Sequence, residues 1–207
     1  MVSFDDVCKR IFADPRWVPN VLIGGVLSFV PILNVFALGY QYRYFEQVHR
    51  GGGFAWPDWN DWEGLFFDGL RLLAMMALYG FLPVILGLWM VHLLGWLSFE
   101  IMGHTLYNMA LVSPLVLLAP LWTVAILYAY QPRRRWAVLQ RPALAWLMTR
   151  AAWPMFLVPT LAFWGLLWLG WMLFGFVFFL GFLVLGAYYT RLFLEIESQG
   201  QTRGVRG

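Results

Sequence analysis

The chain has 207 residues, of which 61% are apolar, 19% are aromatic and only 12% are charged, and its formal net charge is +3. A soluble globular domain is about half apolar and about one quarter charged. The composition therefore excludes a disordered chain, a disulfide scaffold and an ordinary cytosolic enzyme, and it predicts a membrane protein.

Residues 1–16 are predicted to form an amphipathic helix that lies in the membrane interface. Ser3 followed by Asp6 is typical of a capping box at the start of such a helix. The apolar positions recur at helical spacing and share one face, opposite the charged residues. These apolar residues are Phe4, Val7, Cys8, Ile11 and Phe12.

Three long runs with almost no charge follow. Residues 17–42 and 151–190 carry no Asp, Glu, Lys or Arg, and residues 72–132 carry only Glu100. A helix needs about 20 residues to cross a membrane, so 72–132 and 151–190 each predict a hairpin of two spans. Because basic flanks are normally cytoplasmic, we expect a multi-pass protein with both termini in the cytoplasm.

The first run is long enough for one tilted span, but Pro31 and Asn34 could also divide it into two half-length helices. A single span would place basic residues on both sides of the membrane. A short hairpin over residues 17–50, either re-entrant or helical, keeps them all on one side. We favour the hairpin, and the single span stays open.

The two later runs each have an interfacial lead-in. Residues 60–131 are predicted to hold an amphipathic helix that is capped by Asn60 and leads into the second hairpin. Residues 141–196 repeat this arrangement with the third hairpin, and 197–207 form a flexible tail. The whole chain, 1–207, is thus predicted to be one all-α membrane domain. It would contain four full spans, the short N-terminal hairpin and interfacial amphipathic helices.

Tyrosines close each of the three hairpins and are followed by arginine. Tyr and Arg are expected at any membrane–water boundary, as an aromatic belt and as snorkelling cations. A degenerate internal repeat would give the same pattern. The tyrosines at these exits are Tyr40, Tyr42, Tyr128, Tyr130, Tyr188 and Tyr189.

Several motifs in the first 75 residues are familiar. They are FADPRW at 12–17, LIGG at 22–25, PILN at 31–34 and WPDWND at 56–61. Together they resemble an uncharacterised prokaryotic membrane family, domain of unknown function 4013. The resemblance implies a polytopic protein of the inner membrane of a prokaryote. That family has no established activity, so no catalytic role is implied for any residue.

The same motifs have physical roles in building the fold. Asp14 is expected to cap the helix that follows it. Small residues allow the close approach of another helix, whereas proline and asparagine interrupt an apolar helix. The residues expected to act in these two ways are Gly24, Gly25, Gly39, Pro31 and Asn34.

Ionisable residues are scarce within the apolar runs. His92, Glu100 and His104 could form a metal site or the centre of an intramembrane enzyme. His92 lies in an apolar stretch beside Gly95 and Trp96, where a histidine could ligate haem or chlorophyll. The alternative is an interfacial histidine that bonds to a neighbour or to water. No other cofactor is predicted.

A cluster of arginines lies between the second and third apolar runs. In that position we expect contact with anionic lipid headgroups and no binding of nucleic acid. The residues are Arg133, Arg134, Arg135, Arg141 and Arg150.

Two classes of function stay open besides the intramembrane enzyme. The lack of a reactive constellation favours a non-catalytic accessory or scaffold subunit of a membrane complex. Its partners would be lipids and other membrane proteins or a second copy of the chain. Helices broken by proline also fit a small transporter or channel for apolar or lipid-like cargo. That function would need a polar cavity near Asn34, Tyr40, Asn108, Ser113 and Thr123.

Overall fold

The computed structural model describes residues 3–51, 53–97, 104–130 and 153–204, and these contain no β-strand. Some side chains near the ends of the later helices lie outside the description. The elements in chain order are α1 (Phe4–Ala13), α2 (Trp17–Phe29), α3 (Asn34–His49), α4 (Trp62–Met75), the π-helical segment η1 (Met76–Phe81), α5 (Leu82–Leu97), α6 (His104–Tyr130), α8 (Trp153–Leu169), the 3₁₀ turn η3 (Trp171–Leu173) and α9 (Phe174–Gly204).

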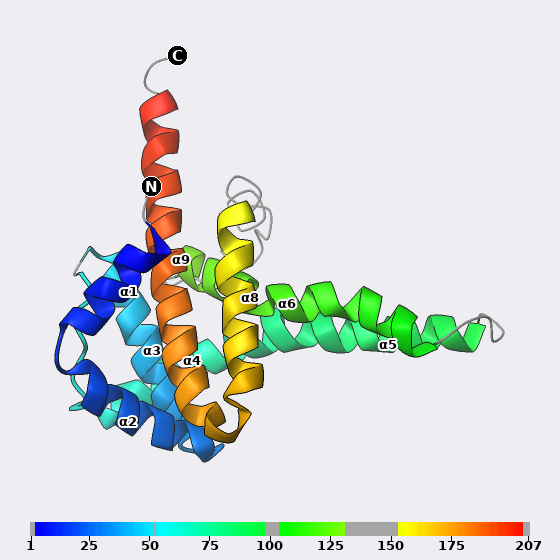
Figure 1. Ribbon diagram of the computed structural model, residues 1–207, viewed down its shortest axis with the longest axis horizontal. Helices are drawn as coiled ribbons and strands as arrows, with labels where there is room; N and C mark the ends of the chain where they lie inside the picture. Colours follow the sequence, from blue (N-terminus) through cyan, green and yellow to red (C-terminus); the bar gives the residue numbers. More distant parts are fainter. Residues whose placement is uncertain (1–2, 52, 98–103, 131–152, 205–207) are drawn as a thin grey trace.

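The helices form a body and a projecting arm (Figure 1). Helix α9 runs through the body and contacts α1, α2, α3, α6 and α8. Helices α5 and α6 pair with each other and extend sideways as the arm, across the direction of α8 and α9. The C-terminal part of α6 returns to the body, where Val124 and Ala125 are fully buried.

The first apolar run forms two helices, because the chain turns over residues 30–33. Helix α2 ends at Phe29 and α3 begins at Asn34, whose backbone N–H donates to the carbonyl of Val30 (2.8 Å). Pro31 lies in this turn. Of the two alternatives that the sequence left open, the structure has the pair of helices.

Glycines allow α9 to pack directly on the backbone of α2. A Cβ added to Gly24 would lie 2.2 Å from the ring of Phe179, and one added to Gly25 would lie 2.1 Å from the ring of Phe176. Both distances are far below van der Waals contact. The two phenylalanine rings of α9 therefore occupy space that any larger residue at these positions would need.

The closest helix contact joins α3 and α4 through a reciprocal glycine pair. A Cβ on Gly39 would lie 1.8 Å from the carbonyl oxygen of Leu65, and a Cβ on Gly69 would lie 1.8 Å from that of Val35. The two backbones therefore touch. Helix α4 starts one residue later than predicted, because Asp61 is the N-cap and accepts from the N–H of Gly64 (3.0 Å).

Helix α4 is not a separate interfacial lead. The helical run continues from α4 through η1 into α5 without a turn. Helix α1 also differs from the expectation. Its apolar residues Val7 and Ile11 are fully buried, and the ring of Phe4 meets the ring of Tyr188 edge-on at 5.3 Å. The apolar face of α1 therefore packs against the protein, and Ser3, at the N-cap position, makes no side-chain capping bond.

The tyrosines at the hairpin exits are interior residues, so the prediction of a lipid-facing belt is wrong for them. Tyr40 and Tyr189 are fully buried, and the exposed fractions of the others reach only 4%. The hydroxyl of Tyr189 donates to the carbonyl of Phe156 (3.1 Å). Buried hydroxyls need such partners. The buried tyrosines are Tyr40, Tyr42, Tyr44, Tyr128, Tyr130, Tyr188 and Tyr189.

Two of these tyrosines bind carbonyls one turn before the proline inside α8. Pro159 has no N–H and leaves the carbonyl of Met155 without its helical partner. The hydroxyl of Tyr188 donates to that carbonyl (3.4 Å), and Tyr189 binds the next carbonyl and also Thr160. Helix α9 thus supplies a donor for the Met155 carbonyl in place of the one that the proline lacks.

Two helical runs among the described residues are long and apolar enough to cross a membrane. They are Trp62–Met90 and Trp171–Ile196. The shorter apolar helices are Trp17–Phe29, Val112–Tyr128 and Met155–Leu169. The described residues therefore provide two helices of full length, whereas the sequence predicts four spans.

Candidate functional site

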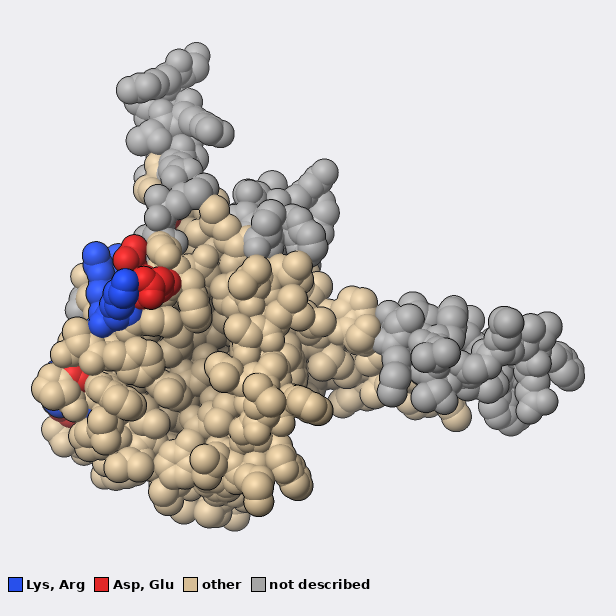
Figure 2. Space-filling view, in the orientation of Figure 1, with Lys and Arg blue, Asp and Glu red and all other residues tan. Residues whose placement is uncertain are grey.

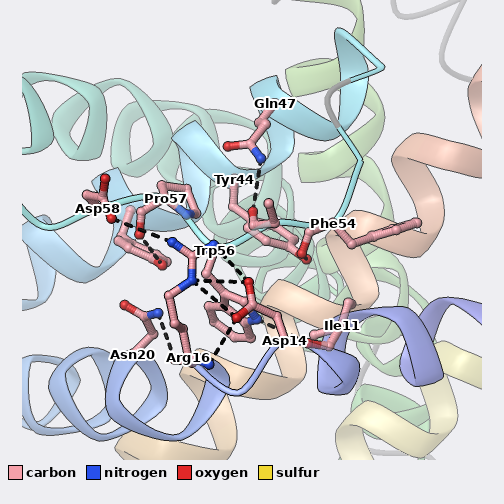
Figure 3. Close-up of polar contacts among 12 residues, drawn as sticks. Ile11, Asp14, Arg16, Asn20, Tyr44, Gln47, Phe54, Trp56, Pro57 and Asp58 are labelled. Atoms are coloured by element: carbon pink, nitrogen blue, oxygen red, sulfur yellow. Dashed lines mark hydrogen bonds and ion pairs between the residues drawn. The ribbon is translucent and has the colours of Figure 1, made fainter.

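A polar cluster joins three segments that are far apart in the sequence (Figure 3). These are the turn between α1 and α2, the outer part of α3, and residues 53–61 between α3 and α4, which we call the strap. Gly51 and Gly53 precede or begin the strap with φ values of 80° and 79°. This left-handed conformation favours glycine, so it explains the glycines where the chain leaves α3.

Side chains of α3 hold the strap by its backbone carbonyls. The hydroxyl of Tyr44 donates to the carbonyl of Phe54 (3.1 Å), and the hydroxyl of Tyr40 donates to that of Pro57 (2.8 Å). The amide of Gln47 donates to the carbonyl of Ala55 (3.0 Å). A strap without regular structure cannot satisfy these carbonyls itself, so α3 supplies the donors.

Two tryptophans of the strap form hydrogen bonds with the N-terminal helices. The indole N–H of Trp56, which is 2% exposed, donates to the carbonyl of Ile11 at the end of α1 (3.1 Å). The indole N–H of Trp59 donates to the side-chain oxygen of Asn20 on α2 (2.7 Å). The ring of Trp59 also stacks on Tyr40, with 4.1 Å between the ring centroids.

A charged pair completes the cluster at the turn between α1 and α2. The guanidinium of Arg16 binds both carboxylate oxygens of Asp14, with the shortest N–O distance 2.8 Å, and reaches Asp58 of the strap at 3.8 Å. Asp14 also accepts from the backbone N–H of Arg16 (3.0 Å), so it does not cap α2 as predicted. The hydrogen bonds from Arg16 lower the pKa of the Asp14 carboxyl to about 2.

This pKa gives a testable expectation. We expect the Asp14 carboxyl to titrate at about pH 2, and Arg16→Gln to raise its pKa toward the ordinary 3.8. Because the folded pKa is the lower one, the stabilisation is present above the ordinary pKa and is lost as pH falls through about 2. Carboxyl ¹³C NMR would measure both values. Arg10→Gln, at an exposed arginine of α1, is the control, and a wild-type pKa near 3.8 would contradict the pairing.

A second group of charges joins α3 to α4, and we call it the α3–α4 ion-pair network. Arg43 binds Asp68 through Nε (2.9 Å) and Asp61 through Nη2 (2.7 Å), and Arg71 binds Asp68 (2.5 Å). The side chains of Arg43 and Asp68 are only 23% and 15% exposed. The N–H of Gly64 and the guanidinium of Arg43 lower the pKa of the Asp61 carboxyl.

Of the three ionisable residues predicted to form a site, only His92 has a described side chain. His92 is exposed on α5, His104 is the first residue of α6, and Glu100 lies outside the described residues. The described part of the chain contains no group of three or more His, Cys, Asp or Glu that could hold a metal ion. The predicted lipid-binding arginines lie outside the described residues: Arg133, Arg134, Arg135, Arg141 and Arg150.

The residues proposed to line a cargo path come from two helices, α3 and α6. Tyr40 is fully buried under the strap, and Thr123 is 2% exposed with its hydroxyl bonded to the carbonyl of Ala119 (2.8 Å). Ser113 is exposed on the arm. The side chain of Asn108 is not among those described. Asn34 is the first residue of α3, at the other end of that helix from Tyr44 and Gln47, which bind the strap.

Several buried polar residues of the described structure were not predicted from the sequence, and Gln41 is the one among them with an unsatisfied atom. Gln41 is fully buried on α3, and its amide N–H donates to the carbonyl of Phe179 on α9 (2.9 Å). Its side-chain oxygen has no hydrogen-bond partner. Nothing in the Tyr-Gln-Tyr sequence around it distinguishes a glutamine that faces the interior from one at a membrane boundary.

The polar cluster and the ion-pair network hold helices together. Their donors and acceptors bind one another and hold α1, α2, α3, the strap and α4 together. Around them, helices expose large apolar side chains and include two that could cross a membrane. These features define an all-helical protein with a largely apolar exterior. Its polar end is the part that contains the polar cluster and the α3–α4 ion-pair network.

The chain belongs to the family described as "Protein of unknown function (DUF4013)", whose model matches residues 23–190. This match confirms the resemblance carried by the early motifs and extends it over most of the chain. It includes α3, the strap and the ion-pair network, and it begins after Asp14 and Arg16. Searches of curated proteins and of solved structures found no significant match.

Proposed function

We propose that this chain is a multi-pass integral protein of the cytoplasmic membrane of a prokaryote, with both termini in the cytoplasm. We propose further that it is non-catalytic and serves as an accessory or scaffold subunit of a membrane complex. One observation carries the membrane location: the extent of apolar side-chain surface that the helices leave uncovered.

The uncovered surface is large and extends over several helices. Met172, Trp168 and Ile32 are 81%, 80% and 78% exposed, and Trp89 and Met90 on the arm are each 67% exposed. Soluble monomers rarely expose contiguous apolar patches of more than a few hundred Å². Contact of this apolar surface with lipid chains costs no free energy, whereas its contact with water is unfavourable.

The distribution of charge supports the same location. On the face seen in Figure 2, Lys, Arg, Asp and Glu gather over α1 and at the nearby edge of the body, and the surface of α8 and the lower body has none. This agrees with the sequence, in which residues 151–190 carry no charged residue. A clear boundary between charged and apolar surface is what a membrane–water interface would require.

In this proposal α5, α6, α8 and α9 are the four membrane spans. Helix α9 is long enough for a full crossing of about 30 Å. Helix α8, with 17 residues, is about 25 Å long and would cross a thin or locally compressed bilayer. Helix α2 has only 13 residues, about 20 Å, so α2 and α3 would enter the membrane as a shallow hairpin.

The scaffold role is supported by how the polar side chains are used. The strap, the tryptophans and the charged residues hold helices to one another, so the polar end acts as a rigid platform. The bare lateral helices would then contact lipids and partner helices.

The native particle tests the scaffold role. We would tag the C-terminus, extract the chain gently, measure the mass of the particle and identify proteins that copurify. We expect a particle well above one 24.0 kDa chain with its detergent belt, containing stoichiometric partners. An unrelated tagged membrane protein of similar size is the control for non-specific capture. A chain that purifies alone as a monomer would contradict the subunit role.

A further inference from the structure

The arm and the α8–α9 pair run across one another (Figure 1), although both expose apolar side chains over much of their length. We propose that the arm is hinged where it leaves the body, and that in a bilayer it swings to lie alongside α8. This inference rests on the proposed membrane location. It assigns the bare face of α8 to a partner within the same chain, the α5–α6 hairpin.

Neither helix pair has a covered outer face. On the arm, Ile85 and Leu86 are 55% and 59% exposed, and on α8 Val158 and Leu166 are 70% and 55% exposed. A hydrocarbon layer about 30 Å thick contains two helix pairs as spans only when both run roughly along its normal. Two crossing pairs cannot both do so. Moving the arm alongside α8 would place both pairs along the normal and cover apolar surface on each.

Both helices of the arm carry a site that favours bending at the same level. The run from α4 into α5 passes through the π-helical segment η1 and then Pro83, and α6 contains Pro114 and Pro120, of which Pro120 lies at this level. Gly80 of η1 lies opposite Thr123 and Ala119 of α6, since its added Cβ would be 3.3 Å from the Thr123 hydroxyl oxygen and 3.9 Å from the Ala119 Cβ. Prolines and π-helical turns are the usual places where helices bend.

The body side of this level is held firmly. Beyond Pro120 most of the described side chains of α6 are buried, with Val124 and Ala125 fully inaccessible. On the arm side of Pro120, the carbonyl of Leu117 accepts from the indole N–H of Trp164 on α8 (3.3 Å), so the base of the arm already touches α8. The geometry therefore gives a buried root, two adjoining sites where the helices can bend, and a bare arm beyond them.

The proline inside α8 provides a contrast. Tyr188 and Tyr189 of α9 bind the carbonyls one turn before Pro159. Pro159 is therefore the matched control for the hinge prolines, because it interrupts a helix without lying at the base of the arm.

A distance measurement in the bilayer tests the hinge. We would replace Cys8 by serine, place nitroxide labels at Met90 and Leu169, and measure their separation by pulsed electron resonance in phospholipid nanodiscs. With both termini in the cytoplasm, the far end of the arm swings toward the Leu169 end of α8. Met90 lies eight residues beyond the start of α5, about 12 Å along the helix, and Leu169 lies five residues beyond Trp164, about 8 Å along α8. The swing should therefore shorten the separation by on the order of 10 Å relative to the crossed arrangement. A second pair, Val26 and Val158, joins two positions of the body and should not change.

Variants make the result specific to the hinge. Pro83→Ala with Pro120→Ala restores two helix N–H groups and should reduce the shortening, whereas Pro159→Ala should leave it unchanged. A Met90–Leu169 separation in nanodiscs equal to that of the crossed arrangement would overturn the inference and leave the membrane location standing. A chain that does not enter nanodiscs at all would overturn the membrane location, and the hinge with it.

Discussion

Gly39→Ala should lower the stability of the folded chain by more than about 3 kcal/mol, because the added methyl group has no space. The Cβ would lie 1.8 Å from the carbonyl oxygen of Leu65, which is backbone and cannot rotate away. Helices α3 and α4 would have to separate and would lose packing along their contact. Overpacking a buried site costs typically about 1–3 kcal/mol, and more where the backbone must move. Thermal unfolding in detergent, followed by tryptophan fluorescence, would measure the loss.

Gly165→Ala is the matched control for this prediction. Gly165 also lies within a helix, but a Cβ added there meets nothing within 4 Å. Alanine is favoured over glycine in a helix by about 1 kcal/mol, so this variant should be as stable as the wild type or slightly more stable. Equal unfolding temperatures for Gly39→Ala and the wild type would show that α3 and α4 do not touch as described.

Arg43→Ala should destabilise the chain by about 2–3 kcal/mol, because Asp68 would keep only one of its two arginine partners. Breaking a fully buried ion pair costs about 3–5 kcal/mol, and the effect here is smaller because Arg43 and Asp68 are 23% and 15% exposed. Chemical unfolding in detergent would measure the difference. Lys9→Ala breaks an exposed pair with Asp5, whose side chains are 71% and 66% exposed, and should change stability by less than about 1 kcal/mol.

A double variant separates the cost of leaving Asp68 with one partner fewer from the net stabilisation that the Arg43–Asp68 pair provides. Arg43→Met with Asp68→Leu removes both charges and leaves apolar side chains of similar size. Such replacements are often neutral or stabilising, so the double variant should be more stable than Arg43→Ala. If Arg43→Ala costs no more than Lys9→Ala, the network does not hold α3 to α4.

The local features of the fold could be predicted from the sequence. The apolar spacing in residues 4–12 indicated the helix, and Pro31 with Asn34 marked the interruption between α2 and α3. The surface that each face covers could not be predicted in the same way. The apolar face of α1 suits a lipid interface and a protein interior equally, and the sequence does not show that α1 packs on α9 with Val7 buried.

The hydrogen bonds of α3 with the strap and with α9 join residues that are distant in the sequence. Tyr40 bonds to a carbonyl 17 residues further along the chain, and Gln41 bonds to one 138 residues away. A tyrosine at the end of an apolar run fits a membrane boundary as well as a buried hydrogen bond. The close approach at Gly39 follows the same rule, because a small residue permits contact but does not name Leu65 as its partner.

The membrane location is the central claim, and one comparison of two introduced thiols tests it most directly. In a Cys8→Ser background, Val158→Cys and Asp58→Cys would be reacted separately with a water-soluble maleimide. The reaction would use intact membranes in open fragments, so that the reagent reaches both faces. The native side chains are almost equally exposed in the protein, at 70% for Val158 and 72% for the side chain of Asp58.

If lipid covers α8, the thiol of the Val158→Cys variant should react at least about tenfold more slowly than that of the Asp58→Cys variant, because a thiol in hydrocarbon does not ionise. Both thiols should react equally after denaturation in detergent. Equal rates in intact membranes would mean that water surrounds α8, and the chain would not be embedded as proposed.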